Sequence, residues 1–219
     1  MTLIQLANPS RVLALSERAL PWLIAATVLA FVVGGVQAWL GIFCWLLMSI
    51  AALGTLVWRH PLADVAAKAA APIGAAFTLI CLLTGALWGR PMWGAYWVWD
   101  ARLTSVLVLF LMYLAVIALW RTIEDPTRAA RAVAVFTLVG AINIPIIKFS
   151  VDWWNTLHQG ASVLRLGGST IHPSILIPLI AMLVAFTLLF LTLHLAAMHN
   201  EILRRRLRTM LMMQAAAAR

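Results

Sequence analysis

Charged residues are scarce in this sequence. Only 11% of the 219 residues are Asp, Glu, Lys or Arg, whereas 64% are hydrophobic. A soluble domain carries about 25% charged residues, so this composition excludes an ordinary soluble fold and favours a membrane protein. The formal net charge is +9, but the basic residues fall in short clusters between apolar runs. This distribution argues against a nucleic-acid-binding protein and is typical of a polytopic membrane protein.

The sequence also lacks the usual motifs of metal, redox and nucleotide sites. Its two cysteines, Cys44 and Cys81, lie inside apolar runs and form no C-x-x-C pair. We therefore expect them to pack as small apolar residues rather than to form a redox pair, a zinc site or a covalent haem attachment. No G-x-x-x-x-G-K-[ST] motif is present, so any ATP hydrolysis belongs to another protein.

Long apolar runs recur six times along the chain. A membrane-spanning helix needs about 20 mostly apolar residues, and lipid offers the backbone no hydrogen-bond partner outside the helix itself. We predict an all-α, polytopic membrane helix bundle that forms a single domain over residues 1–219. The first apolar run has no clean cleavage site after it, so we expect it to be retained. The six predicted transmembrane helices cover about residues 20–36, 38–58, 71–88, 104–120, 132–148 and 173–197.

The lysine and arginine residues predict the orientation of this bundle. With the N-terminus inside, the outer segments carry only Arg90, Arg102, Lys148 and Arg165 of the 16 basic residues. Because positive charge concentrates on the inner side, we predict that both termini are cytoplasmic. The basic run 204–208 would then lie at the cytoplasmic surface, in contact with anionic lipid or with a partner subunit.

This orientation predicts outer loops at about residues 89–105 and 148–172. It also requires an earlier outer loop between the first two spans, and the connection there is too short. Only Gly34–Gln37 separates the first two apolar runs. Gly-Gly permits a tight turn there. The turn leaves the first run at about 17 residues, the lower limit for a span. The connection near residues 34–39 is therefore unusually short for two spans.

The outer segment RPMWGAYWVWDARLTS, residues 90–105, is crowded with aromatic side chains. Trp and Tyr favour the membrane–water boundary, so an aromatic belt is one interpretation. If the segment is helical, Trp93, Tyr96, Trp97 and Asp100 share one face. Such a shelf would suit a large planar ligand. The residues alone leave both interpretations open.

The second outer loop adds two tryptophans, Trp153 and Trp154, and two histidines, His158 and His172. A histidine beside an aromatic shelf is a suitable ligand for haem iron, although a loop histidine can also bond only to solvent or backbone.

Three nearby features also have alternative interpretations. Arg90 and Arg102 could pair with haem propionates, with lipid phosphate or with the loop itself. Asp100 could pair with Arg102 or with a haem-side donor, or it could cap a helix. Gly85 and Gly89 form a G-x-x-x-G motif, which we interpret as a helix-packing contact.

Together these motifs resemble the haem exporter protein C (CcmC) family of cytochrome c maturation. The resemblance covers about residues 40–178, through APIGAAFTLICLLTGALWGRPMWG, WGAYWVWDARLTS and NIPIIKFSVDWWNTLHQG. The second segment is similar to the tryptophan-rich WWD signature of haem-handling membrane proteins. The positions that match the signature are Trp93, Gly94, Trp97, Trp99 and Asp100.

The resemblance implies a haem-delivery component of the bacterial inner membrane. Such a protein holds haem b non-covalently and transiently at the periplasmic face and passes it to the haem chaperone CcmE. Its implied partners are the ABC transporter subunits CcmA and CcmB, the small protein CcmD and membrane lipid. The implied axial iron ligand is His158, whereas the family's other outer histidine, between the first two spans, has no match here. The residues expected to hold the haem are Trp93, Gly94, Tyr96, Trp97, Trp99, Asp100, Arg90, Arg102, Trp153 and Trp154.

Two other functional classes make different demands on the sequence. A membrane subunit of a haem or small-molecule transporter would need polar residues along its spans. A haem-attaching enzyme of the longer WWD type would carry paired histidines within spans. The charges of this chain lie at span ends, which favours a haem-handling protein without its own catalytic motif. His172 is a weaker candidate to replace the missing ligand.

Overall fold

The computed structural model describes residues 35–158, 160, 163 and 168–217, and every regular element among them is helical. The first described segment is helical, Gly35–Trp58, and its last turn, Gly54–Trp58, is a π-helix labelled η1. Four helices, α4 to α7, follow the long helix α3. Their bounds are α3 Pro61–Trp93, α4 Ala101–Thr122, α5 Pro126–Gly140, α6 Asn143–Trp153 and α7 Pro173–Ala217.

Five of these helical segments are long and apolar enough to cross a membrane: Gly35–Trp58, Pro61–Trp93, Ala101–Thr122, Pro126–Trp153 and Pro173–Ala217. They confirm an all-helical membrane bundle for the described part of the chain. The predicted span 20–36 falls almost wholly outside the described residues, so the sixth helix stays a prediction. The side of the membrane on which each terminus lies is likewise still a prediction.

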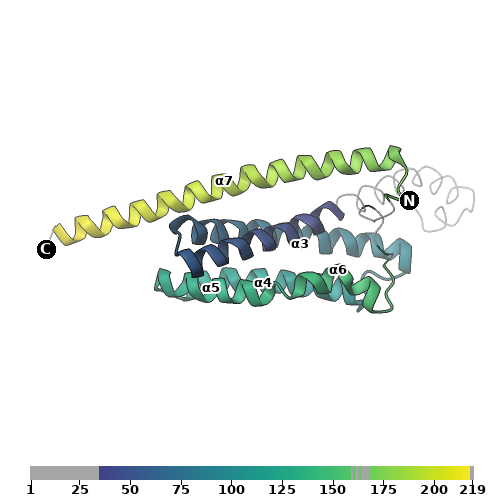
Figure 1. Cartoon of the computed structure of the whole chain (residues 1–219), viewed down its shortest axis with the longest axis horizontal. Coiled ribbons are helices and arrows are strands. Elements are labelled where there is room, and N and C mark those ends of the chain that lie inside the picture. The colour runs from purple at the N-terminus through teal and green to yellow at the C-terminus, as the bar shows by residue number, and fades with distance from the viewer. Residues whose placement is uncertain (1–34, 159, 161–162, 164–167, 218–219) are drawn as a thin grey trace, which may run out of the picture.

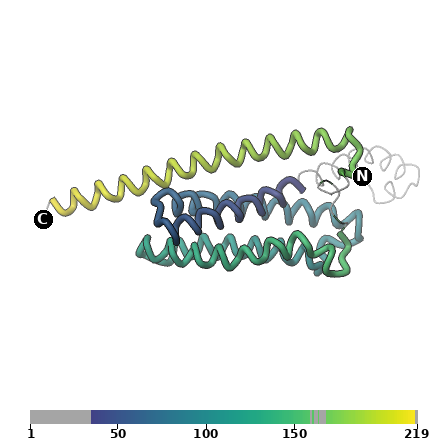
Figure 2. Tube along the Cα trace, viewed as in Figure 1, coloured from purple at the N-terminus to yellow at the C-terminus, as the bar shows by residue number. Residues whose placement is uncertain are grey.

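Two helices are much longer than the predicted spans. The span predicted at 71–88 lies within the 33 residues of α3, and the span predicted at 173–197 lies within the 45 residues of α7. At 1.5 Å per residue these helices are about 50 and 68 Å long, against about 30 Å of hydrocarbon. The C-terminal end of α7 accordingly extends past the other helices (Figures 1 and 2).

The tight turn predicted over Gly34–Gln37 is wrong for its last three residues. The structure begins the first described helix at Gly35, and the side chains of Val36 and Gln37 are buried. Packing against the bundle therefore favours a helix here over the turn that Gly-Gly would permit.

The predicted span 132–148 consists of two helices instead of one. Helix α5 ends at Gly140 and α6 begins at Asn143. Pro145 lies in the first turn of α6, where a proline without an N–H is tolerated, whereas an uninterrupted helix would bring its ring against the carbonyl of residue 141. The break directs Asn143 towards α4, where its Nδ2 donates to Ser105 O at 2.9 Å.

The core is built around two large side chains that each make a buried hydrogen bond. Trp45 donates from Nε1 to Thr137 O at 3.1 Å, and Tyr113 donates from its hydroxyl to Gly41 O at 2.6 Å. Their rings meet edge to face, with centroids 4.9 Å apart. These contacts join the first described helix to α4 and α5.

Glycines make room for these two rings. A Cβ at Gly74 would overlap the Tyr113 ring, and one at Gly140 would overlap Trp45 and Met112. Close approach of helices through small residues is typical of membrane proteins. At Gly85 no atom of the described residues lies within 4 Å of an added Cβ, so the predicted G-x-x-x-G contact stays a prediction there.

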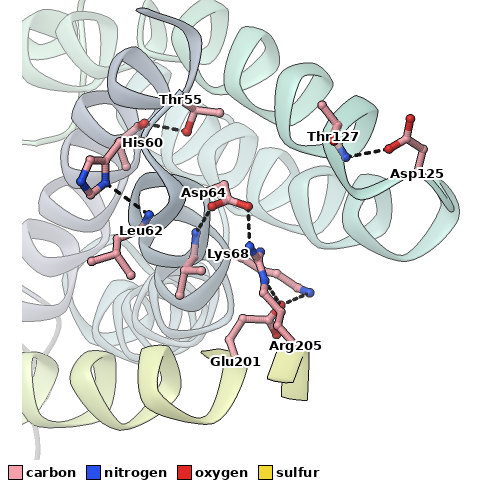
Figure 3. A network of polar contacts seen from close by, with 11 residues as sticks. Thr55, His60, Leu62, Asp64, Lys68, Asp125, Thr127, Glu201 and Arg205 are labelled. Atoms are coloured by element: carbon pink, nitrogen blue, oxygen red, sulfur yellow. Dashed lines mark hydrogen bonds and ion pairs between the residues drawn. The ribbon is translucent and has the colours of Figure 1, made fainter. Parts of the chain in front are cut away.

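A network of ion pairs joins α3 to α7 at the end of the bundle opposite the aromatic segment (Figure 3). Lys68 Nζ lies 2.7 Å from Glu201 Oε1, and Arg205 NH1 lies 2.8 Å from Asp64 Oδ2. Arg205 also donates from Nε to Glu201 Oε1 at 3.1 Å. The network fixes α7 on α3 at the point where the apolar part of α7 ends.

We expect Gly74→Ala to destabilise the bundle by about 1–3 kcal/mol, because the added methyl group overlaps a fully buried ring. Thermal unfolding in detergent, followed by circular dichroism, measures the effect. Gly85→Ala on the same helix is the matched control and should be neutral or stabilising, since alanine favours a helix by about 1 kcal/mol over glycine. Equal effects of the two substitutions would contradict this packing.

Candidate functional site

The middle of the aromatic segment is a short loop between two helices. Helix α3 ends at Trp93, and Gly94 adopts a left-handed conformation with φ of 76° that favours glycine. Residues 94–100 form a loop, and α4 begins after Asp100. The common helical face proposed for Trp93, Tyr96, Trp97 and Asp100 is therefore wrong, and the loop is shorter than the predicted 89–105.

Asp100 ties this loop to the second outer segment. Its Oδ1 accepts the backbone N–H of Arg102 at 2.8 Å and so caps α4, a contact worth about 1 kcal/mol. Its Oδ2 accepts the backbone N–H of Leu157 at 2.9 Å. The predicted cap is confirmed, and the same carboxylate joins two segments 57 residues apart.

His158 lies against both Asp100 and Trp93. Its Nδ1 is 3.3 Å from Asp100 Oδ1, an ion-pair distance without the geometry of a hydrogen bond. The imidazole meets the Trp93 ring edge to face, with centroids 4.9 Å apart, and Trp93 in turn meets Trp88. The histidine side chain is 21% exposed and the aspartate side chain 3%. The structure thus brings three predicted site residues into direct contact.

Burial and hydrogen bonds shift the pKa values of this pair. Burial lowers the pKa of His158, and the opposing charge of Asp100 does not outweigh it, so the neutral imidazole is favoured. Burial alone would raise the pKa of Asp100. The N–H groups of Leu157 and Arg102 and the charge of His158 outweigh burial and lower it. Around neutral pH the site therefore holds a neutral histidine beside an ionised carboxylate.

The remaining aromatic side chains do not form one flat shelf. Trp97 and Trp99 meet at 80° with centroids 5.6 Å apart, and Trp153 meets Trp154 at 67°. Trp99 is 76% exposed, whereas the Nε1 of Trp97 is buried without a hydrogen-bond partner in the described part of the chain. The rings present edges and separate faces to a ligand instead of a continuous plane.

A cavity of about 450 Å³ lies next to Asp100, between α4 and α6. Trp99 and Trp154 form part of its wall, and its polar lining consists of Asp100, Thr104, Ser105, Asn143 and Asn155. Trp93, Trp97 and His158 are not among its lining residues. Of the polar residues, sequence reasoning identified Asp100 and missed the other four. A polar residue within an apolar run, such as Asn143, is the signal that could have found one of them.

The two predicted arginines are engaged within the protein. Arg90 donates to Gly94 O and lies over the Tyr96 ring, 5.4 Å from its centroid. Arg102 is half-buried in the first turn of α4 and interacts electrostatically with Asp100 and Asp152. The loop pairing considered for Arg90 is therefore observed.

The second outer loop also begins later than predicted. Helix α6 continues to Trp153, so Lys148 is helical and the loop starts at Trp154. Trp153 stacks on Phe149 of the same helix, with centroids 5.4 Å apart. His172, the alternative iron ligand, accepts the backbone N–H of Ser174 on Nδ1 at 3.3 Å at the start of α7. This contact gives His172 a structural role as a helix cap.

We expect acidification to destabilise this site in two steps. Because the pKa of His158 is lowered in the folded chain, its contribution to stability is complete at a pH above 6.5, its ordinary pKa. That contribution is lost as the pH falls below 6.5. Asp100 loses its contribution only below its ordinary value of 3.8. Unfolding midpoints between pH 7 and 5 should fall more for the parent chain than for His158→Ala. Equal decreases in the unfolding midpoints of the two chains would contradict the lowered pKa of His158.

Comparison with known proteins places these residues in a family. Residues 35–213 match the sequence profile of the family described as Heme exporter protein C. A Bradyrhizobium diazoefficiens protein named Heme exporter protein C is 67% identical over 238 residues, covering 98% of this chain and 90% of its own length. The Escherichia coli K12 protein of that name is 41% identical, covering 92% and 91%, and the Paracoccus denitrificans one is 40% identical, covering 96% and 98%. On this similarity the chain belongs to the Heme exporter protein C family.

Proposed function

We propose that this chain is a haem-delivery component of cytochrome c maturation, which holds haem b at one end of the bundle and passes it on. The name of its relatives, Heme exporter protein C, supports a role in haem export or handling. The observation that carries the finer proposal is the contact of His158 with Trp93 and Asp100. A neutral imidazole beside an aromatic ring and a carboxylate is suited to ligating haem iron.

The residues of the site fit this cargo. Haem would supply an iron ion that accepts a nitrogen lone pair and a broad apolar ring that stacks on aromatic side chains. His158 would donate the lone pair, and Trp93, whose ring meets the imidazole, would offer apolar contact. The Nε1–H of Trp97 is buried and has no hydrogen-bond partner among the described residues. A haem carboxylate could accept a hydrogen bond from it.

Each predicted binding residue has a place in this proposal. Gly94 ends α3 so that Trp93 and Trp97 lie on either side of a sharp turn. Arg90 and Tyr96 hold that turn from outside. The exposed rings of Trp153 and Trp154, together with the half-buried Arg102, would face the membrane boundary, where a haem with charged propionates enters.

The proposed setting is the bacterial inner membrane, with six spans and both termini in the cytoplasm. The site then faces the periplasm, where the haem chaperone CcmE would receive the haem. CcmA, CcmB and CcmD are the proposed partners in the membrane, with ATP hydrolysis in a partner subunit. The chain itself would bind and release haem without breaking a covalent bond.

The first outer loop is still proposed to be missing near residues 34–39. The alignment with the Bradyrhizobium protein runs over 238 residues, more than the 219 of this chain. That relative therefore contains residues for which this chain has no counterpart. A missing loop would remove one axial histidine and leave His158 as the single outer ligand from this chain.

We expect the purified chain in detergent to show a Soret band after incubation with haem, and His158→Ala to lose it. Loss of an axial ligand should weaken haem binding about 10- to 100-fold or more. Visible absorption and a haem titration at fixed protein concentration measure the difference. His172→Ala, on the same predicted side, is the matched control and should retain the band.

A third chain carries the first outer loop of a relative, inserted near residues 34–39. It distinguishes the loss of a ligand with that loop from a failure of the haem proposal itself. A band only in this chain would mean that the missing loop carried an essential ligand. Absence of a Soret band in all of these chains would contradict the haem proposal and favour the interpretation of the tryptophans as an interfacial belt. The transporter alternative predicts haem movement across proteoliposomes by this chain without partners, which delivery does not require.

A further inference from the structure

Both oxygens of Asp100 are engaged inside the protein. Oδ1 accepts the Arg102 N–H at 2.8 Å, and Oδ2 accepts the Leu157 N–H at 2.9 Å. The side chain is only 3% exposed, although Asp100 is one of the residues that line the cavity. Its carboxylate therefore acts mainly through the residues that it touches.

The contact with His158 restricts which imidazole nitrogen carries the proton. A neutral imidazole has one N–H donor and one acceptor, whereas an ionised carboxylate only accepts. Since Nδ1 lies 3.3 Å from Asp100 Oδ1, a lone pair there would face a negative oxygen. Electrostatics thus favours the hydrogen on Nδ1 and the free lone pair on Nε2.

Two further contacts hold the histidine in place. Trp93 packs edge to face against the imidazole, and the backbone N–H of His158 donates to Thr156 Oγ1 at 2.9 Å. The N–H of the preceding residue, Leu157, is held by Asp100 itself. Ring and backbone are therefore oriented before any ligand arrives, which is the arrangement that precise ligation needs.

We propose that Asp100 is a positioning residue that fixes His158 as the Nδ1-protonated tautomer and so presents Nε2 as the lone-pair donor. This inference rests on the proposed function only for the identity of the acceptor, haem iron. It assigns Asp100 a role different from the expected direct contact with haem. A carboxylate behind a ligating histidine fixes the tautomer and raises the basicity of the ligand.

Asp100→Asn isolates this role. Asparagine caps helices as well as aspartate does, so α4 keeps its first turn when the amide oxygen takes the Oδ1 position. The NH₂ group then faces the Leu157 N–H. In the opposite orientation it faces both the Arg102 N–H and the imidazole Nδ1. In either orientation the negative charge that favours a hydrogen on Nδ1 is gone, so the Nδ1-protonated tautomer is no longer enforced. Asp152→Asn is the matched control, since Asp152 is an exposed acid on α6.

The first readout needs no haem. The full chain, labelled with ¹⁵N-histidine in lipid nanodiscs, contains five histidines, and subtraction of the His158→Ala spectrum assigns His158. We expect a protonated Nδ1 and an unprotonated Nε2 in the parent chain and in Asp152→Asn. Asp100→Asn should show a mixture of tautomers or a protonated Nε2.

The second readout is the iron–histidine stretch of the ferrous, haem-loaded protein by resonance Raman. It should fall in Asp100→Asn, because a less basic imidazole binds iron more weakly, and haem affinity should fall about 10- to 100-fold. A purely structural role would change neither the tautomer nor the stretching frequency of the folded fraction. Asp100→Ser, another good helix cap without a carboxylate, replaces Asp100→Asn if the latter does not fold.

The outcomes separate this inference from the proposed function. A parent chain with His158 protonated on Nε2, or an unchanged tautomer in Asp100→Asn, overturns the inference whether or not haem binds. A parent chain with the expected tautomer that binds no haem overturns the proposed function and supports the tautomer control by Asp100.

Discussion

The carboxylate of Asp100 accepts backbone N–H groups from two segments that are far apart in the sequence, and the end of the bundle that carries the aromatic segment depends on these bonds. One bond begins α4 and the other holds the residue before His158. A buried charge without such partners would cost several kcal/mol, so its position is tightly constrained. The two outer segments are consequently positioned together, and His158 reaches Trp93 because Asp100 holds its backbone.

The turn between α3 and α4 explains why the aromatic residues are so closely spaced. Gly94 reverses the chain after Trp93, and Asp100 restarts a helix six residues later. Within so short a loop the rings cannot align as a plane, so they meet at steep angles and leave a cavity between Trp99 and Trp154. Under the proposed function, such a site would hold a planar molecule by its edges and by separate faces and would release it more readily than one continuous stack.

Much of the fold could be predicted from the sequence, because hydrophobic length alone identifies membrane helices. The ends of the helices could not. Hydropathy falls at Glu201 and the arginines that follow, yet the helix continues because arginine and leucine are good helix formers and Glu201 pairs with Arg205 one turn later. The resemblance singled out Asp100 and His158, whereas their contact joins distant residues that no local pattern relates. The helical face assigned to Trp93, Tyr96 and Trp97 failed because Gly94 adopts a left-handed conformation.

The bundle is held together by small residues at its centre and by charge at its other end. In lipid, apolar side chains gain little from leaving the solvent, so close packing and buried hydrogen bonds must hold the helices together. Trp45 and Tyr113 provide both, and their large rings fit because Gly74 and Gly140 lack side chains.

The ion-pair network attaches α7 to α3. In the most apolar window of α7, only 6% of the residues are buried. Asp64, Lys68, Glu201 and Arg205 balance one another in charge, which lowers the cost of partial burial. The neighbouring exposed arginines Arg204, Arg206 and Arg208 are thus left to carry the excess positive charge at this end. Such an excess favours the cytoplasmic side of a membrane, and it therefore supports a periplasmic position for the Asp100–His158 site at the opposite end.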